Sequence, residues 1–226
     1  MSANPRLAAF QTLLRIDKEH SYADLLIDRE LSAGQLHGPD RGLFTELVYG
    51  VLRKQGNLDH VLGQFSRIPV AKLERAVLLL LRLGLYQLLN LDRVPVSAAV
   101  NETVILAKQF APRSAGFINA VLRNVDRGRD RIAYPDQHRA PAAYLAARYA
   151  HPGWLTAAWL DQLGPVEAEQ LATAMAEPPP LTIRVNTLRT SRADLATRLA
   201  DAGARVEPCR YAPHGLVIAA APGSPT

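Results

Sequence analysis

Apolar residues follow a helical spacing along the first part of the chain, most densely between residues 69 and 91. In this stretch they recur every three or four positions and cover nearly the whole circumference of the predicted helix. Arg75 and Arg82 are expected to mark its wet edge, and they interrupt the run before it reaches the length of a membrane span. Gly84 weakens the helix locally, so we expect another helix to cross close to the backbone there. The pattern predicts a buried central helix, opened by Pro69, with other helices packed around it.

The rest of the first 130 residues has the same helical period and no strand signal. Further helices are predicted over residues 5–20, 21–33, 40–65, 96–110 and 114–125. The side chains of Asn4, Ser21 and Ser114 are expected to cap three of these helices, and Gly56-Asn57 is expected to interrupt the longest one. Residues 1–130 are therefore predicted to form an all-helical bundle.

The pattern changes after a charged segment that contains glycine and proline, and we expect a linker over residues 131–138. Beyond it, short helices are predicted over residues 141–149, 152–163 and 165–176, strands over 181–186, 205–208 and 215–219, and a helix capped by Ser191 after the first strand. Residues 139–226 should thus form a small α+β domain of β-α-β-β, RRM-like order, whose sheet has an exposed edge. The predicted fold class of the whole chain is mainly α.

Charge distribution narrows the class of partner. The chain has 226 residues and a net charge of +5. Basic residues outnumber acidic ones 18 to 13 over residues 1–135, whereas the two are equal, 8 to 8, over 136–226. Of the 26 basic residues 22 are arginine, whose planar guanidinium suits phosphate and base edges, although a GC-rich genome gives the same bias. Nucleic acid is the expected partner class, and an acidic protein is the next.

Other composition features suggest exclusions. Cys209 is the single cysteine, so no internal disulfide framework is expected, and with no visible signal peptide this favours the cytoplasm. The six histidines are scattered without metal-ligand spacing, so no metal is expected.

Three groups of basic residues are candidates for RNA contact. The densest contains Arg113, Arg123, Arg127, Arg129 and Arg131; the second contains Arg41, Arg53 and Lys54; the third contains Arg6 and Arg15. Arginines at a helix C-terminus that continue into a linker can bind phosphates without reading sequence. They also complement the helix dipole, and Asp126 and Asp130 neutralise part of the first group, so both interpretations stay open.

Several polar and aromatic residues have structural interpretations. Glu102 and Arg123 lie on otherwise apolar helices, and we expect them to form a buried ion pair rather than a catalytic site. Arg184 and Asn186 should share one sheet face, available to RNA or to a further domain. The aromatic residues of the second part are expected to pack in its core: Tyr144, Tyr149, Trp154 and Trp159.

Long ordered motifs resemble a known family. In the helical part they are DR at 40–41, TELVYGVLR at 45–53, LD at 58–59, LGLYQLL at 83–89, VPVSAAVNETV at 94–104 and GFINAVLR at 116–123. In the second part they are HP at 151–152 with Trp154, PP at 178–179 and RVN at 184–186. The first set resembles the NusB-like domain, and together they look like the front of the Sun/Fmu/RsmB ribosomal RNA cytosine-5 methyltransferases.

This resemblance implies a NusB-like RNA-binding domain followed by the lead-in region of a small-subunit (16S) ribosomal RNA methyltransferase that uses S-adenosylmethionine. We find neither the family's glycine-rich cofactor loop nor its two cysteine motifs in the chain. It therefore looks like the N-terminal portion of a longer enzyme, inactive alone, with no catalytic or cofactor-binding residue of its own. Its expected partners are ribosomal RNA and its own catalytic domain, without membrane or metal.

Two short segments resemble family site motifs but lack their context. Residues 220–223 resemble the cofactor loop, yet no helix N-terminus follows to offer free N–H groups. Pro208-Cys209 resembles the catalytic pair, yet the expected preceding strand and acidic residue are absent, so Cys209 is interpreted as a small apolar residue at a strand end.

Two alternative functions remain. A NusB-type transcription antitermination factor would bind RNA and a ribosomal protein, although residues 137–226 argue against a stand-alone factor. A helical protein-interaction module would bind no nucleic acid.

Overall fold

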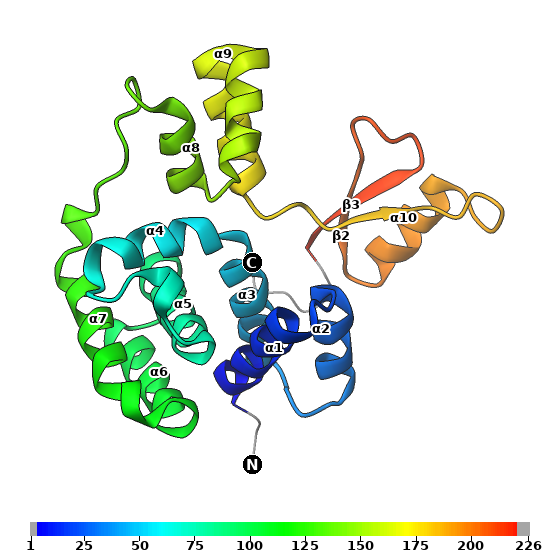
Figure 1. Ribbon diagram of the computed structural model, residues 1–226. Helices are drawn as coiled ribbons and strands as arrows, with labels where there is room; N and C mark the ends of the chain where they lie inside the picture. The colour runs from blue at the N-terminus through cyan, green and yellow to red at the C-terminus, as the bar shows by residue number, and fades with distance from the viewer. Residues whose placement is uncertain (1–3, 221–226) are drawn as a thin grey trace. The chain divides into compact units, whose positions relative to one another are not determined.

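The computed structural model describes residues 4–220 (Figure 1). The chain forms two compact units, one that ends at Ala176 and one that begins at Glu177. The first unit contains α1 Pro5–Glu19, α2 Ala23–Ser32, α3 Pro39–Arg53, α4 Gln55–Phe65, α5 Arg75–Asn90, α6 Val96–Phe110, α7 Ala115–Arg127, α8 Pro141–Tyr149 and α9 Gly153–Ala176, with short 3-10 turns η1 Val70–Lys72, η2 Pro112–Ser114 and η3 Arg129–Arg131. No strand lies within residues 4–130, so the predicted all-helical bundle is confirmed.

Helix α5 is the centre of the first unit. Every residue from Val77 to Leu88 is buried, and α1, α3, α4, α6 and α7 all pack against it. The predicted central helix is confirmed, but its predicted start at Pro69 is wrong. The chain makes the turn η1 and then runs extended through Leu73, which packs against the core, before the helix begins at Arg75. Packing of Leu73 therefore takes precedence over helical periodicity.

Two glycines allow other helices to approach closely. A Cβ on Gly84 would stand 2.8 Å from Leu122 Cδ1 of α7 and 3.1 Å from Thr103 Oγ1 of α6, which confirms the predicted close crossing. A Cβ on Gly50 of α3 would collide with the ring of Tyr86 on α5, a crossing that the sequence pattern did not predict. Both glycines are helical, so they are required for space rather than for conformational freedom.

The two arginines of α5 have opposite environments. Arg75 is largely exposed and pairs with Asp17 of α1 at 2.7 Å. Arg82 is only 7% exposed and donates from Nε and Nη2 to the two carboxylate oxygens of Asp59 on α4, both at 2.7 Å. The predicted wet edge is therefore right for Arg75 and wrong for Arg82. A carboxylate from a neighbouring helix compensates the buried charge, and helical periodicity carries no information about such a partner.

The predicted helix starts are partly confirmed. Asn4 Oδ1 accepts from the backbone N–H groups of Arg6 and Leu7 at 2.9 and 3.3 Å, as predicted. Ser21 does not cap α2, because its hydroxyl donates to Glu19 instead. Ser114 does not cap α7 either, since η2 leads into the helix and Ser114 adopts helical backbone angles.

The segment after α7 is fixed to α4. Gln64 accepts from Ala133 N–H at 2.9 Å and donates back to Ala133 C=O at 3.0 Å. Asn57, which is buried, donates to the Tyr134 hydroxyl at 3.0 Å and to Ala147 C=O at 2.9 Å. We call these bonds the α4 clasp. It joins the predicted linker and helix α8 to the bundle.

Helices α8 and α9 pack against each other, and α9 is interrupted at Gly164, whose φ of 76° places it in the left-handed region, followed by Pro165. The prediction of three short helices here is confirmed. Helices α8 and α9 belong to the same compact unit as the bundle. The predicted domain boundary near residue 139 stays a prediction.

The second unit has the predicted β-α-β-β order. It contains β1 Thr182–Arg184, α10 Arg192–Asp201, β2 Arg205–Pro208 and β3 Gly215–Ala220. The antiparallel sheet has the order β1-β3-β2, with Ile183 opposite Leu216 and Val206 opposite Ile218. Helix α10 packs against β2 and β3, and Ser191 caps it by accepting from Asp194 N–H at 3.1 Å, as predicted. Within residues 177–220 no further strand pairs with β1 or β2, so the outer edge of each is open, as predicted.

Candidate nucleic-acid interface

The C-terminus of α7 carries the densest basic group, as the sequence predicts. Arg123 and Arg127 lie in the last turns of α7, the chain turns at Gly128, and Arg129 and Arg131 follow in η3. The regular spacing of four residues therefore ends with the helix. Arg123, Arg127 and Arg131 are exposed, whereas Arg129 is half-buried.

Neighbouring side chains hold the two helical arginines along the surface of α7. Arg123 Nε donates to Asn119 Oδ1 at 3.0 Å. Arg127 donates from Nη2 to Asn124 Oδ1 at 2.7 Å and from Nε to the backbone carbonyl of Arg123 at 3.3 Å. These bonds use only part of the five N–H donors of each guanidinium, so both side chains keep donors for a ligand.

Arg129 is the arginine of this group that the protein neutralises. Its Nη2 lies 3.1 Å from Asp126 Oδ1, and both side chains are about one-third exposed. The side chains of Arg113 and Arg131, in contrast, have no hydrogen bond or ion pair with any acceptor in residues 4–220. The neutralisation expected from the acidic residues therefore reaches Arg129 only, through Asp126. At the C-terminal end of α7 the free cationic donors lie on Arg123, Arg127 and Arg131, whereas Arg113 lies in η2, before the first turn of the same helix.

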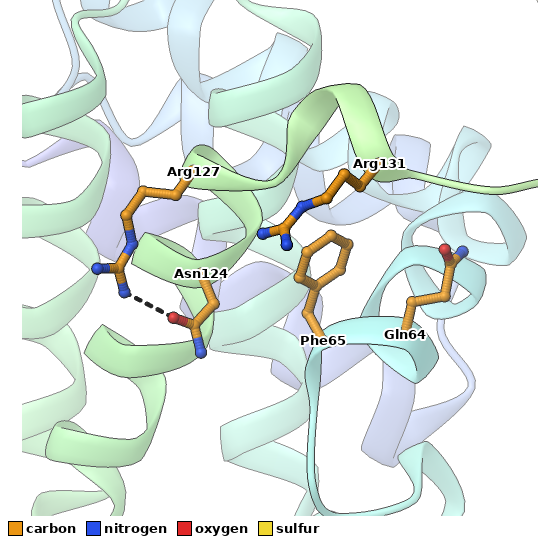
Figure 2. Close-up of a pocket in the computed structure, with 5 residues that line it drawn as sticks. All are labelled: Gln64, Phe65, Asn124, Arg127 and Arg131. Atoms are coloured by element: carbon orange, nitrogen blue, oxygen red, sulfur yellow. Dashed lines mark hydrogen bonds between the residues drawn. The ribbon is translucent and has the colours of Figure 1, made fainter.

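A hollow of about 650 Å³ lies between the last turn of α4 and the end of α7. Its lining residues are Gln64, Phe65, Asn124, Arg127 and Arg131 (Figure 2). The guanidinium of Arg131 extends toward the Phe65 ring, and Arg127 lies on the opposite side of Asn124. We call this the α4–α7 hollow. It combines two arginines, two amides and one aromatic ring.

Gly128 gives Phe65 its position in the hollow. A Cβ on this glycine would stand 2.5 Å from Phe65 Cε1 and 3.1 Å from Arg131 Nη2. The ring and the guanidinium therefore meet at a corner that the glycine leaves free. Gln64 is held on the other side by its two hydrogen bonds to Ala133, so the last turn of α4 is fixed.

The second predicted group is not assembled into one site. Arg41 and Arg53 stand near opposite ends of α3, about 18 Å apart along the helix axis at the ordinary rise per residue. Arg41 Nη1 donates to the Leu31 carbonyl at 3.0 Å and so helps to cap α2. Arg53 is half-buried, close enough to Tyr86 to oppose the rise of the phenol pKa that burial and the Glu46 carboxylate cause. Lys54 is half-buried between α3 and α4, so this group has no common exposed face.

The third group serves the fold. Arg6 Nε donates to Oε1 of Gln87 at 2.6 Å, and Gln87 is fully buried in α5. Arg15 pairs with Glu19 at 3.4 Å one turn further along α1.

The predicted ion pair between Glu102 and Arg123 is wrong. Glu102 accepts from Asn4 Nδ2 at 3.3 Å, whereas Arg123 is exposed and bonded to Asn119. Each side chain therefore has another hydrogen-bond partner. Helices α6 and α7 pack against each other through apolar residues instead. Arg123 is therefore not part of the core, and its side chain is available at the surface.

The predicted packing roles of the aromatic residues are confirmed for Tyr144, Tyr149 and Trp159, which pack around Leu145 in the α8–α9 cluster. The prediction is wrong for Trp154, which is 73% exposed in the first turn of α9.

In the second unit, Arg184 is exposed at the end of β1, but Asn186 lies beyond the strand, where its Oδ1 accepts from Leu188 N–H at 3.1 Å. The two polar residues are therefore not on one strand.

The described residues contain no catalytic constellation. Cys209 is half-buried at the end of β2, where its N–H donates to the Gly215 carbonyl at 3.1 Å, as expected of a small residue at a strand end. The expected lack of a strand before it is wrong, because β2 ends at Pro208. Residues 221–223 of the cofactor-loop resemblance lie outside the described residues. Among residues 4–220, no three His, Cys, Asp or Glu side chains are grouped for a metal ion, and no helix is long and apolar enough to cross a membrane.

Sequence reasoning missed Gln64, Phe65 and Asn124. Periodicity assigns Phe65 only to the end of a helix, and its contact with Gly128 joins positions far apart in the chain. The local signal was an aromatic residue directly before the Ser66 break, and it does not reveal what stands opposite.

Comparisons with known proteins give a consistent assignment. Residues 3–127 match the family described as "NusB family", and residues 151–223 match "Methyltr_RsmF/B-like, ferredoxin-like domain". A Bacillus subtilis protein named "Probable ribosomal RNA small subunit methyltransferase B" is 36% identical over 88% of this chain and 44% of its own length. A Synechocystis protein of the same name is 36% identical over 98% and 49%, and the Pseudomonas putida "Ribosomal RNA small subunit methyltransferase B" is 34% identical over 96% and 48%.

The chain thus spans about half the length of these relatives. A solved structure titled "Crystal Structure of PH0851" matches 96% of this chain and 49% of its own, with a TM-score of 0.67 and 19% identity. At that identity the likeness supports the fold alone.

Proposed function

Because this chain belongs to the NusB family through residues 3–127 and continues into a ferredoxin-like domain of the RsmF/B type, we propose that it is the RNA-recognition portion of a ribosomal RNA small subunit methyltransferase. The observation that carries the proposal is the basic group around the α4–α7 hollow. Its free donors on Arg127 and Arg131 suit the phosphates of a nucleic acid.

The names of the relatives support a methyltransferase activity for the whole enzyme. The full-length protein would transfer a methyl group from S-adenosylmethionine to a cytosine C5 of small-subunit ribosomal RNA, and such work would place it in the cytoplasm. The sequence of this chain lacks the family's cofactor loop and cysteine motifs, so it would contribute binding and positioning. Its second unit, with two open sheet edges, would face the catalytic part.

A stand-alone antitermination factor accounts less well for the chain. Such a factor would need the helical bundle alone, whereas residues 151–223 match a domain of methyltransferases. A protein-interaction module that binds no nucleic acid would not account for the arginine side chains whose donors remain unbonded.

A binding experiment separates the three functions. The chain should bind fragments of small-subunit ribosomal RNA in a filter assay, with an affinity that falls steeply as salt rises, because each phosphate contact releases condensed counterions. Calorimetry of the same chain with S-adenosylmethionine should show no heat. Binding to a ribosomal protein without binding to the RNA would contradict the proposal.

A further inference from the structure

The α4–α7 hollow is more than a basic surface. Its volume of about 650 Å³ lies within the range of small-ligand sites, which is roughly 300–1,000 Å³. A bare phosphate-binding surface needs exposed cations and no recess. Here a recess is present, and an aromatic ring forms one of its walls.

The polar groups of the hollow require acceptors. The guanidinium of Arg131 donates to no acceptor in residues 4–220, and Arg127 Nη1 is likewise without a partner there. Asn124 uses its oxygen to accept from Arg127, which leaves its amide N–H groups free to donate. Gln64 is committed at both ends of its amide to Ala133, so it shapes the wall and does not turn toward a ligand. The ligand should therefore be rich in acceptors on the side of Arg127 and Arg131.

Phe65 adds a second requirement. A flat aromatic ring beside guanidinium groups is the arrangement on which proteins stack the bases of single-stranded RNA. Phe65 lines a recess between two helices. A base within a duplex is paired and stacked on its neighbours, so it offers no free face to this ring. Only a base that has left its stack can enter.

We infer that the α4–α7 hollow captures one unpaired nucleotide of the RNA, with its base against Phe65 and its phosphate between Arg127 and Arg131. This inference rests on the proposed function and adds its substrate class: a bulge, a loop or a single strand. The base identity is read weakly, because stacking accepts every base and Asn124 supplies the one free amide. Gly128 leaves room for the Phe65 ring and the Arg131 guanidinium to lie side by side, where they can contact the base and its phosphate.

The test uses two RNA hairpins of equal length. One has a fully paired stem, and the other has a single bulged nucleotide, which is a fluorescent analogue of adenine. The full chain should bind the bulged hairpin about tenfold more tightly than the paired one, the size expected of one stacked base, and binding should quench the analogue. Phe65→Leu should abolish the preference and the quenching while affinity for the paired hairpin and its salt dependence persist. Phe117→Leu, a change at another half-buried phenylalanine that packs on the core from α7, should leave the preference intact.

A second variant covers the case in which Phe65→Leu unfolds. Gly128→Ala, at a backbone conformation that alanine accepts, brings a methyl group against the Phe65 ring, so the ring must shift and the preference should fall in the same way. Equal affinity of the parent for both hairpins, or an unchanged preference in a folded Phe65→Leu chain, would overturn the inference and leave a phosphate-binding surface only. Binding of neither hairpin at low salt would overturn the proposed function itself.

Discussion

Asp59 and Arg82 form a two-point ion pair inside the first unit, with both oxygen–nitrogen distances at 2.7 Å. The pair fixes α4 against α5. Since the last turn of α4 forms part of the α4–α7 hollow, the pair also helps to position the candidate RNA site.

Removing one member of this pair should be costly. Asp59→Ala is expected to lower the free energy of unfolding by about 3 kcal/mol, because it leaves the Arg82 guanidinium buried without a partner. Arg75→Ala, which breaks the exposed pair with Asp17, should cost less than about 1 kcal/mol. Urea denaturation of the two variants measures the difference. Equal, small losses would mean that Arg82 reaches solvent.

The close approach of α3 to α5 depends on Gly50. Gly50→Ala should destabilise the bundle by about 2–3 kcal/mol, since the added methyl group collides with the Tyr86 ring in a packed core. Gly42→Ala is the matched control on the same helix. Its Cβ meets nothing within 4 Å, so we expect a gain of about 0.5–1 kcal/mol from helix propensity. Thermal melts of both variants decide the matter, and a Gly50→Ala chain as stable as its parent would show that α3 can move away.

The salt dependence of RNA binding should report the free arginines. Replacing Arg127 and Arg131 together by alanine should reduce the slope of log affinity against log salt by about 1.4, or about 0.7 per lost contact on a single strand. Lys18→Ala with Arg29→Ala removes the same charge from exposed positions on α1 and α2 and should leave the slope nearly unchanged. If both double variants change the slope equally, binding depends on net charge rather than on this site.

Two tyrosines should make stability depend on alkaline pH. The hydrogen bond from Tyr49 to Asp24, together with burial, raises the pKa of Tyr49 to about 12, and burial with the Glu46 carboxylate raises the pKa of Tyr86. A phenol whose pKa is raised by folding stabilises the folded state at pH values below its unfolded pKa of about 10. That contribution is lost as the pH rises from about 10 through 12. Tyr49→Phe should therefore weaken the loss of stability over this interval, which denaturant titrations at several pH values would measure.

Much of the fold is predictable from the sequence because it depends on local information. The helical period locates α5, and proline, glycine and capping residues locate most helix ends. The alternation of residues 181–186 locates β1. The motifs identified the family correctly, as the matches over residues 3–127 and 151–223 confirm.

The remainder depends on contacts between distant positions. A buried arginine such as Arg82 looks like a surface residue until Asp59 is known to stand opposite. Glu102 and Arg123 look like a pair because their helices are neighbours, yet nearer partners take both side chains. For the candidate site the sequence predicts where arginines cluster. It does not predict which guanidinium groups keep unbonded donors, since that depends on Asp126, Asn119 and Asn124 as acceptors. Phe65 lay outside the prediction for the same reason.

The α4 clasp also has a kinetic consequence. Gln64 and Ala133 are 69 positions apart, and Asn57 and Tyr134 are 77 apart, so each bond closes a long loop that contains α5, α6 and α7. Closing such a loop is entropically unfavourable until the intervening helices have condensed, so the clasp should form late in folding. By the same reasoning it should open first in the native state, releasing α8 and α9 as one unit while α5 stays closed. The Ala133 amide hydrogen should then exchange with solvent much faster than the amides of Leu80 and Leu81, which makes it a reporter of this partial opening.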